Sequence, residues 1–180
     1  MTSRLQAKFQ ILCETASIET VKKFYQQYFK EIDIHHNDDY AFRWSAINGK
    51  LETCKWLYSL DGVINMRMYG NFAFLLAASN GHTEVCRWIH TTLDGGIFLY
   101  TANNYAFAHA AKNEHIETCI FLEQLYAEQN LLSRISHTDY YIHYTRQKNI
   151  YYRGLYTVLH CMSDHSMFDP NIITLVRQYN

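Results

Sequence analysis

One pattern of apolar and polar positions occurs three times along this chain. The copies begin 32 and 33 residues apart and run over Ala41 to Tyr58, Ala73 to His90 and Ala106 to Glu123. Each copy predicts two short helices. In the middle copy, Phe74, Ala77 and Ala78 fall on one face of a 3.6-residue period, which predicts the first helix. The second helix carries its own apolar stripe, which in the first copy is Leu51, Cys54, Leu57 and Tyr58. A repeat of this length indicates stacked supersecondary units.

The turn between the two helices also repeats. Gly49 and Gly81 follow the first helix and can end it with a positive φ, whereas the third copy has Glu114 there. A carboxylate in the first turn of the second helix, favoured by about 0.3 to 1 kcal/mol, recurs as Glu52, Glu84 and Glu117.

Aligning the copies predicts three columns of residues that run through the stack and are buried in it. A column of small residues, where adjacent units approach closely, is Ala46, Ala78 and Ala111. A second column is Val21, Cys54, Cys86 and Cys119, and a column of large rings is Trp56, Trp88 and Phe121. Packing alone accounts for these residues without any chemistry.

The period divides the chain into repeated units and a remainder. We expect four units in residues 1–126, at 5–37, 38–69, 70–102 and 103–126, the first of them degenerate as a terminal cap should be. Residues 127–180 lose the period, and we expect them to form a helical C-terminal capping region. Its features are a Tyr-rich segment at 140–156, a helical stretch at 155–162 and a last helix at 171–179, opened by Asp169 and Pro170.

The segments between units predict projecting, hairpin-like fingers. Asp61-Gly62 and Asp94-Gly95 are turn signals, and β-branched or aromatic residues follow them. The finger tips are apolar where solvent alone would favour polar residues; they are Ile34-His35-His36, Met66-Arg67-Met68 and Phe98-Leu99-Tyr100.

Composition narrows the function. The 180 residues suit one domain, and 16 Lys and Arg against 17 Asp and Glu give no field that would gather nucleic acid or anionic lipid. No apolar run spans a bilayer and the N-terminus lacks a signal-peptide pattern, so we expect a soluble, cytoplasmic chain that is monomeric when free. The five cysteines fit buried residues in a reducing compartment.

The repeated unit resembles the ankyrin repeat. In the middle copy the matching residues are Phe74, Ala77, Ala78, Gly81, His82, Glu84 and Ile89. The family's Thr-Pro-Leu-His tetrad is replaced in the three copies by Tyr40-Ala41-Phe42-Arg43, Phe72-Ala73-Phe74-Leu75 and Tyr105-Ala106-Phe107-Ala108. The variant with Trp in the second helix is similar to divergent ankyrin arrays of large DNA viruses and intracellular bacteria. The resemblance therefore implies an all-α solenoid of stacked helix-turn-helix units.

The resemblance also implies a partner-binding site on the concave face made by the fingers and first helices. Carried over by position, its residues are His36, Asn37, Asp39, Ile47, Asn48, Met66, Arg67, Met68, Tyr69, Asn71, Ser79, Asn80, Thr101, Asn104, Lys112 and Asn113. Tyr69 is the predicted anchor, because Tyr, Met and Arg concentrate binding energy in interfaces.

Four other sites were weighed against this interpretation. The i,i+4 pairs His82/Cys86 and His115/Cys119 have a zinc-ligand spacing, but the family pattern assigns them to the turn and the core. His35 and His36 fit a solvated finger better than a metal cluster. A cysteine nucleophile would need His160, Cys161, Asp164 and His165, and single-stranded nucleic acid would need the Tyr-rich segment with Arg146, Lys148 and Arg153.

The sequence thus predicts a protein-binding scaffold without catalysis, cofactor or metal, whose partner is another protein. A host-directed effector or modulator would use the same mechanism in another cell. The alternative is a small enzyme or metal-binding protein with its site in residues 127–180.

Overall fold

All the secondary structure in the described part of the chain is helical. The computed structural model describes residues 2–61, 64–93, 97, 99 and 104–161, and the side chains of 4–60, 64–67, 71–93, 97, 99 and 104–155. For these residues the predicted all-α fold is confirmed. The elements are α1 (Thr2–Thr15), α2 (Ile18–Tyr28), α3 (His36–Ile47), α4 (Leu51–Asp61), α5 (Met68–Ser79), α6 (Thr83–Thr92), α7 (Tyr105–Lys112), α8 (Ile116–Glu128), the 3-10 turn η2 (Leu132–Arg134) and α9 (Asp139–Cys161).

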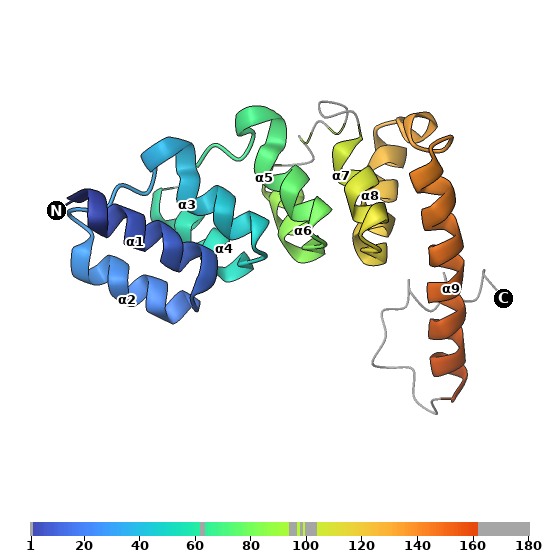
Figure 1. Cartoon of the computed structure of the whole chain (residues 1–180), viewed down its shortest axis with the longest axis horizontal. Coiled ribbons are helices and arrows are strands. Elements are labelled where there is room, and N and C mark those ends of the chain that lie inside the picture. Colours follow the sequence, from blue (N-terminus) through green and yellow to red (C-terminus); the bar gives the residue numbers. More distant parts are fainter. Residues whose placement is uncertain (1, 62–63, 94–96, 98, 100–103, 162–180) are drawn as a thin grey trace.

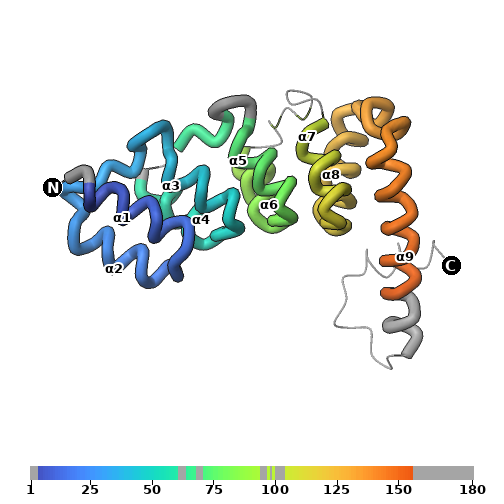
Figure 2. The backbone as a smooth tube through the Cα atoms, viewed as in Figure 1, coloured from blue at the N-terminus to red at the C-terminus, as the bar shows by residue number. Residues whose placement is uncertain are grey.

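The helices form a row of pairs that runs along the long axis of the molecule (Figure 1). Helices α1 and α2 pack together, as do α3 and α4, α5 and α6, and α7 and α8. The first helices of the pairs also contact one another in order, from α1 to α3, α5 and α7, and α9 continues this layer beyond α7. Figure 2 shows the same order from the N-terminus to α9.

Left-handed residues end the first helices as the glycine pattern predicts. Gly49 has φ +69° and Gly81 has φ +80°, and each begins a turn to the second helix. After α3, the N–H of Lys50 donates to the Ser45 carbonyl over 2.8 Å, which closes the helix end. Glu114 takes the same position after α7 with φ +61°, although it has a side chain.

The predicted buried columns are confirmed where small residues form them. The column of Val21, Cys54, Cys86 and Cys119 is fully buried, and Ala46, Ala78 and Ala111 are at most 1% exposed. The ring column differs in that Trp56 and Trp88 are only half-buried. Their rings meet rings of the preceding pair, Tyr25 with Trp56 at 5.3 Å and Tyr58 with Trp88 at 5.9 Å between centroids.

The apolar residues of the connecting segments lie in the core. Ile64 is 6% exposed, Met66 3%, and Ile97 and Leu99 1% each. Burial among the helix pairs therefore explains their apolar character, and Met66 does not project as a finger tip. The other finger residues, 62–63, 94–96, 98 and 100–103, lie outside the described residues, so the predicted hairpins cannot be placed.

The C-terminal region begins with one long helix. Helix α9 covers 23 residues and joins the Tyr-rich segment to the helical stretch predicted from residue 155 in one continuous helix. Thr138 caps its start by accepting a hydrogen bond from the Tyr141 N–H over 3.2 Å. On its inner face Tyr144 meets Phe107 at 5.3 Å. The helix predicted at 171–179 lies outside the described residues.

Candidate binding surface

The first helices carry a second apolar face besides the one that enters the core. In α3, Ala41 and Ser45 are buried, whereas Tyr40 and Trp44 point away from these residues and are half-buried. The equivalent positions of the neighbouring first helices are also apolar or aromatic. We call this set the first-helix stripe: Ile11, Tyr40, Trp44, Phe72, Leu76, Tyr105 and His109.

The stripe is exposed on α1 and α7, is half-buried in its middle, and lies apart from the core. Ile11 is 57% exposed and Tyr105 is 38% exposed. Among the described residues, the main core cluster and the side chains packed against it include no member of the stripe. Exposed apolar surface that is continuous over several elements marks interaction sites.

Rings of the stripe pack against one another within α3 and within α7. Tyr40 and Trp44 have centroids 5.6 Å apart, and Tyr105 and His109 are stacked at 4.0 Å with an angle of 29°. On α5, Phe72 and Leu76 are likewise four residues apart. These contacts restrict the rotamers of the rings, so that less conformational entropy is lost when a partner binds.

Opposite charges stand at the two ends of the stripe. Glu14 lies three residues after Ile11 on α1, and Lys112 lies three residues after His109 on α7. The same position holds the uncharged Ile47 on α3 and Ser79 on α5, both buried. Lys112 is exposed, and Glu14 interacts with the neighbouring helix: burial and a hydrogen bond with the Glu14 carboxylate raise the pKa of Tyr40.

Polar side chains fasten three of the first helices to the segment that follows their pair. Gln6 bonds both backbone groups of Asp33, and the Asp39 carboxylate accepts from the Asn65 N–H over 2.9 Å. Asn104 donates to the Arg134 carbonyl over 3.0 Å. The position recurs as Gln6, Asp39, Asn71 and Asn104, which we call the polar column.

The polar column changes the role of three residues predicted to bind the partner. Asp39, Asn71 and Asn104 have φ of +59°, +67° and +64°, and Asp39 and Asn71 are only 5% and 1% exposed. Asn and Asp tolerate this left-handed backbone better than other side-chain-bearing residues. These positions therefore shape the turn and hold the loop, rather than offering side chains to a partner.

Arg43 stabilises the left-handed turn that precedes the regular part of α3. Asn37 and Asp38 share the left-handed backbone of Asp39. The Arg43 guanidinium donates from Nε to the Asp38 carbonyl over 2.8 Å and from its terminal nitrogen to the Asn37 carbonyl over 2.7 Å. The side chains of Asn37 and Asp38 remain exposed beside the stripe.

The other predicted partner residues divide by exposure. Ile47, Met66 and Ser79 are buried at 7%, 3% and 5% exposure and belong to the packing of the pairs. Met68 and Tyr69 begin α5, but their side chains and all of Thr101 lie outside the described part. The exposed predicted residues are His36, Asn37, Asn48, Arg67, Asn80, Lys112 and Asn113.

Two of these exposed residues join neighbouring pairs. Asn80 donates from its side-chain amide to the Ile47 carbonyl over 3.1 Å, and Asn113 donates in the same way to the Ser79 carbonyl over 3.2 Å. Both lie in the turn after a first helix. They form the turn edge of the row, at the opposite end of the first helices from the polar column.

Sequence reasoning missed the first-helix stripe. Its signal was present as i,i+4 pairs of large side chains at equivalent positions, Tyr40 with Trp44 and Tyr105 with His109. Because α5 is apolar on several sides, the hydrophobic pattern did not distinguish the core face of the first helices from the exposed one.

The side chains weighed for metal or nucleophilic chemistry are mostly structural in the described part. The His82 ring packs so closely on Gly49 that a Cβ there would lie 2.5 Å from Nδ1. Burial lowers the pKa of His82 and raises that of the Cys86 thiol, and it raises the pKa of Cys119 to about 12. Within the described residues no three His, Cys, Asp or Glu side chains gather into a metal site. The side chains of His160 and Cys161, and all of Asp164 and His165, lie outside the description.

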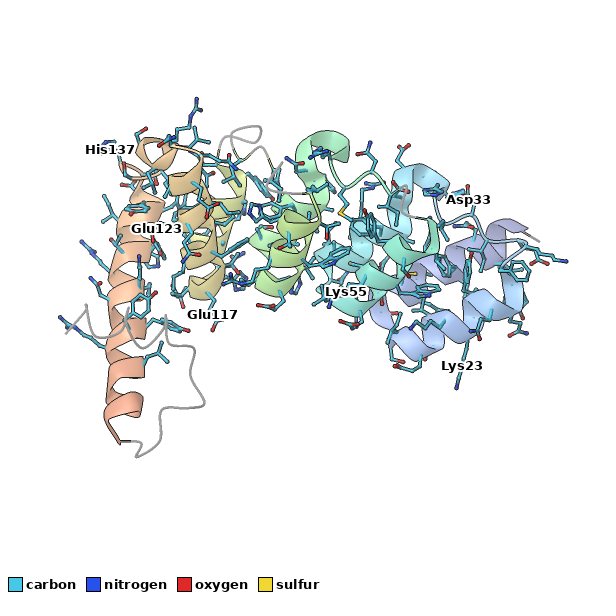
Figure 3. All side chains as sticks on the ribbon, turned by 180° about the vertical axis from the view of Figure 1, so that it is seen from behind. Lys23, Asp33, Lys55, Glu117, Glu123 and His137 are labelled. Carbon is cyan, nitrogen blue, oxygen red and sulfur yellow. The ribbon has the colours of Figure 1, made fainter. Side chains whose placement is uncertain are left out.

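A charged network joins α9 to α8 around Glu123, at the place labelled in Figure 3. The Glu123 carboxylate accepts from Tyr141 over 2.6 Å, from Tyr144 over 2.8 Å and from Lys148 over 2.6 Å. Burial acts to raise the pKa of Glu123, but these three hydrogen bonds together outweigh it and the pKa is lowered. The network holds α9 against α8. Tyr141, Tyr144 and Lys148 of the Tyr-rich segment are therefore used inside the fold.

No helix of the described residues has the length and apolar character that crossing a membrane requires. A scan against protein-family models gave no match, and neither curated proteins nor solved structures contained a significant one.

Proposed function

We propose that this chain is a protein-interaction scaffold of the ankyrin-repeat type, which binds a partner protein through the first-helix stripe and performs no catalysis. The scaffold would act as a monomer in the cytoplasm of the cell in which it works, its own or a host's. The single observation that carries the proposal is the stripe itself. Tyr and Trp are over-represented among the residues that dominate binding energy, and four of the seven stripe side chains are Tyr, Trp or Phe.

Several features support the ankyrin interpretation of the fold. The helix pairs begin and end where the repeated string places them, and the left-handed turn glycines Gly49 and Gly81 fit the family pattern. The family's Thr and His of the tetrad fasten the finger to the first helix. In this chain the polar column supplies comparable hydrogen bonds, for example from Gln6 to Asp33. A divergent member that replaces the tetrad in this way accounts for both the resemblance and the departures from it.

The stripe also fits the concave face that the resemblance implies. That face is made of first helices and fingers, and the stripe lies along α1, α3, α5 and α7. The exposed predicted residues His36 and Asn37 lie at the start of α3, on the same helix as Tyr40 and Trp44. The proposed surface therefore combines the stripe with the polar residues beside it.

The test compares three variants in affinity capture from a candidate host lysate. Trp44→Ala/Leu76→Ala removes the centre of the stripe, and Arg67→Ala/Tyr69→Ala removes the finger anchor predicted from the sequence. Phe29→Ala is the matched control, because Phe29 is an exposed aromatic residue (54%) at the end of α2 and outside the stripe. Circular dichroism first establishes that each variant is folded.

We expect the stripe variant to lose a protein that the wild type and Phe29→Ala both retain. Titration of the purified partner should then show at least a tenfold weaker Kd for Trp44→Ala/Leu76→Ala, which corresponds to about 1.4 kcal/mol. Equal capture by the stripe variant and wild type would exclude the stripe as the binding site. Loss with the Arg67/Tyr69 variant alone would move the site to the fingers.

A further inference from the structure

The side chains of the first-helix stripe recur once per first helix along the row, and we call each such set a rung. Each first helix carries one rung, such as Tyr40 with Trp44 on α3, and neighbouring first helices are in contact. Packed helices lie about 8 to 10 Å apart, toward the lower limit where the residues between them are small. Ala46 and Ala78 are such small, fully buried residues. A ligand that runs along the row therefore meets an equivalent rung about every 8 to 10 Å.

Different backbone conformations match this spacing unequally. In an extended β-strand, residues on one face recur about every 6.6 Å, and a residue three positions on, at about 10 Å, faces the opposite way. An α-helix needs seven residues and about 10.5 Å to return to the same face. A polyproline II helix returns to the same face every three residues, after about 9.3 Å. The polyproline II repeat lies inside the spacing of packed helices, the α-helical repeat lies just above it, and the strand repeat lies well below it.

The chemistry of the rungs also favours polyproline II. Proline-rich segments are recognised by surfaces lined with aromatic side chains, and they lose little entropy on binding because their conformation is preformed. The stripe presents rings at Tyr40, Trp44, Phe72 and Tyr105. The Trp44 indole and the Tyr105 hydroxyl are hydrogen-bond donors, which suits a backbone whose carbonyls have no internal partners, whereas the Tyr40 hydroxyl already bonds Glu14.

The charges at the two ends of the stripe determine in which direction a bound segment lies along it. Glu14 follows the α1 rung and Lys112 follows the α7 rung, whereas the equivalent residues between them are uncharged and buried. From α1 to α7 there are three steps of the row, so a segment with a proline over each rung needs about ten residues, and a charged residue on each flank brings it to about twelve. Its basic end would lie over Glu14 and its acidic end over Lys112.

We propose that the partner segment held by the first-helix stripe is a proline-rich polyproline II segment with proline at every third position, a basic residue at its α1 end and an acidic residue at its α7 end. This inference rests on the proposed function and names the chemistry of the partner at that site.

The probe is a fluorescein-labelled peptide of sequence RPAAPAAPAAPE, titrated with the full chain and followed by fluorescence anisotropy. A control peptide of the same composition, RPAPAAAPAPAE, breaks the three-residue spacing. We expect the regular peptide to bind at least tenfold more tightly than the control. Tyr105→Ala and Trp44→Ala should each weaken its binding at least fivefold, and Phe29→Ala should leave it unchanged.

The end charge is tested by a charge reversal. Lys112→Glu should weaken RPAAPAAPAAPE at least threefold and should strengthen RPAAPAAPAAPK by a similar factor, since the reversed end then attracts a basic residue. If Lys112→Glu changed the affinity for both peptides by the same factor, the side chain would not distinguish the charge at the end of the peptide. That result would overturn the proposed direction of binding.

Three results would overturn the proline-rich assignment. These are equal binding of the two spacings, tighter binding of an amphipathic helical peptide with a heptad repeat of leucines, and concentration-dependent self-association that is lost in Trp44→Ala. If neither peptide bound, but a partner was captured and its capture required Trp44 and Leu76, this inference alone would be overturned. A captured partner that is independent of both residues would overturn the proposed function as well.

Discussion

The side-chain amide of Gln6 forms two hydrogen bonds with the backbone of Asp33, donating from Nε2 to the carbonyl over 2.8 Å and accepting at Oε1 from the N–H over 2.9 Å. Gln6 is 6% exposed, so water cannot readily replace these bonds. We expect Gln6→Ala to lower the free energy of unfolding by about 1 to 2 kcal/mol. Urea denaturation followed by circular dichroism measures it. Gln27→Ala, on an exposed position of α2, is the control and should change stability by less than about 0.5 kcal/mol. Equal effects of the two variants would show that the polar column does not fasten the loop.

The turn glycines should not accept a side chain. At Gly49 a Cβ would lie 2.5 Å from the His82 ring, and the φ of +69° is itself unfavourable for alanine. We expect Gly49→Ala to cost more than about 1 kcal/mol in the free energy of unfolding. Gly154→Ala is the matched control, because Gly154 lies in α9 with no atom within 4 Å of the added Cβ. That change should stabilise the protein by up to about 1 kcal/mol. The prediction fails if both substitutions shift the urea midpoint in the same direction.

Glu114 offers the reverse experiment. It occupies the turn position with φ +61°, where a side chain is strained by about 1 to 2 kcal/mol. Replacing it by glycine removes this strain and adds chain entropy to the unfolded state. The net effect of Glu114→Gly should be a gain of about 0.5 to 1 kcal/mol, measured as a higher melting temperature. Lys22→Gly, on an exposed position inside α2, should instead lower stability by about 1 kcal/mol. A loss of stability in both variants would contradict the strain at Glu114.

The Glu123 network predicts a stability that depends on pH. The folded-state pKa of Glu123 lies below its ordinary value of 4.5, because the hydrogen bonds from Lys148, Tyr141 and Tyr144 outweigh the effect of burial. A lowered folded-state pKa contributes stability that is present above pH 4.5 and is lost as pH falls through the folded-state value. The gap in urea midpoint between wild type and Glu123→Gln should therefore stay constant near neutral pH and shrink below about pH 4.5.

The control for this pH series is Glu52→Gln. Glu52 forms an ion pair with Lys55 at 3.0 Å, but its side chain is 66% exposed, so solvent weakens the interaction. The midpoint of this variant should follow that of wild type at every pH. A gap for Glu123→Gln that does not change with pH would show that the carboxylate is not the titrating group.

The sequence was most informative where the backbone or the volume of a residue leaves few choices. Gly49 and Gly81 predicted the helix ends correctly, since a positive φ favours glycine. The buried cysteine column was predicted from equivalent positions in the repeats, because a small apolar residue that recurs there fits the narrow space between stacked helices. The same reasoning did not apply to Glu114, whose left-handed backbone follows from its neighbours and not from its own preference.

The candidate site was less predictable because it depends on which face of a helix the neighbours cover. Asp39 and Asn71 look like exposed polar residues in the sequence, yet both are buried, and the loop after α4 binds the Asp39 carboxylate through the Asn65 N–H. Tyr40 and Trp44 look like core residues, yet the core lies on the other side of α3. Polarity alone gave the wrong side for Asp39 and Asn71, which the sequence predicted to face a partner. The α9 helix was missed as one element because its Tyr-rich half has weak helix propensity and is held by packing on α7 and α8.

The main contacts of the first helices join only neighbours, α1 to α3, α3 to α5, α5 to α7 and α7 to α9. Folding can then begin at the most stable pair and spread outward, with little chain entropy lost in closing long loops. A severe defect at α5 would separate the molecule into two parts, each able to keep its own pairs. A strongly destabilising substitution in the middle of the row should therefore produce two unfolding transitions. A substitution at an end should only shorten the part that unfolds cooperatively.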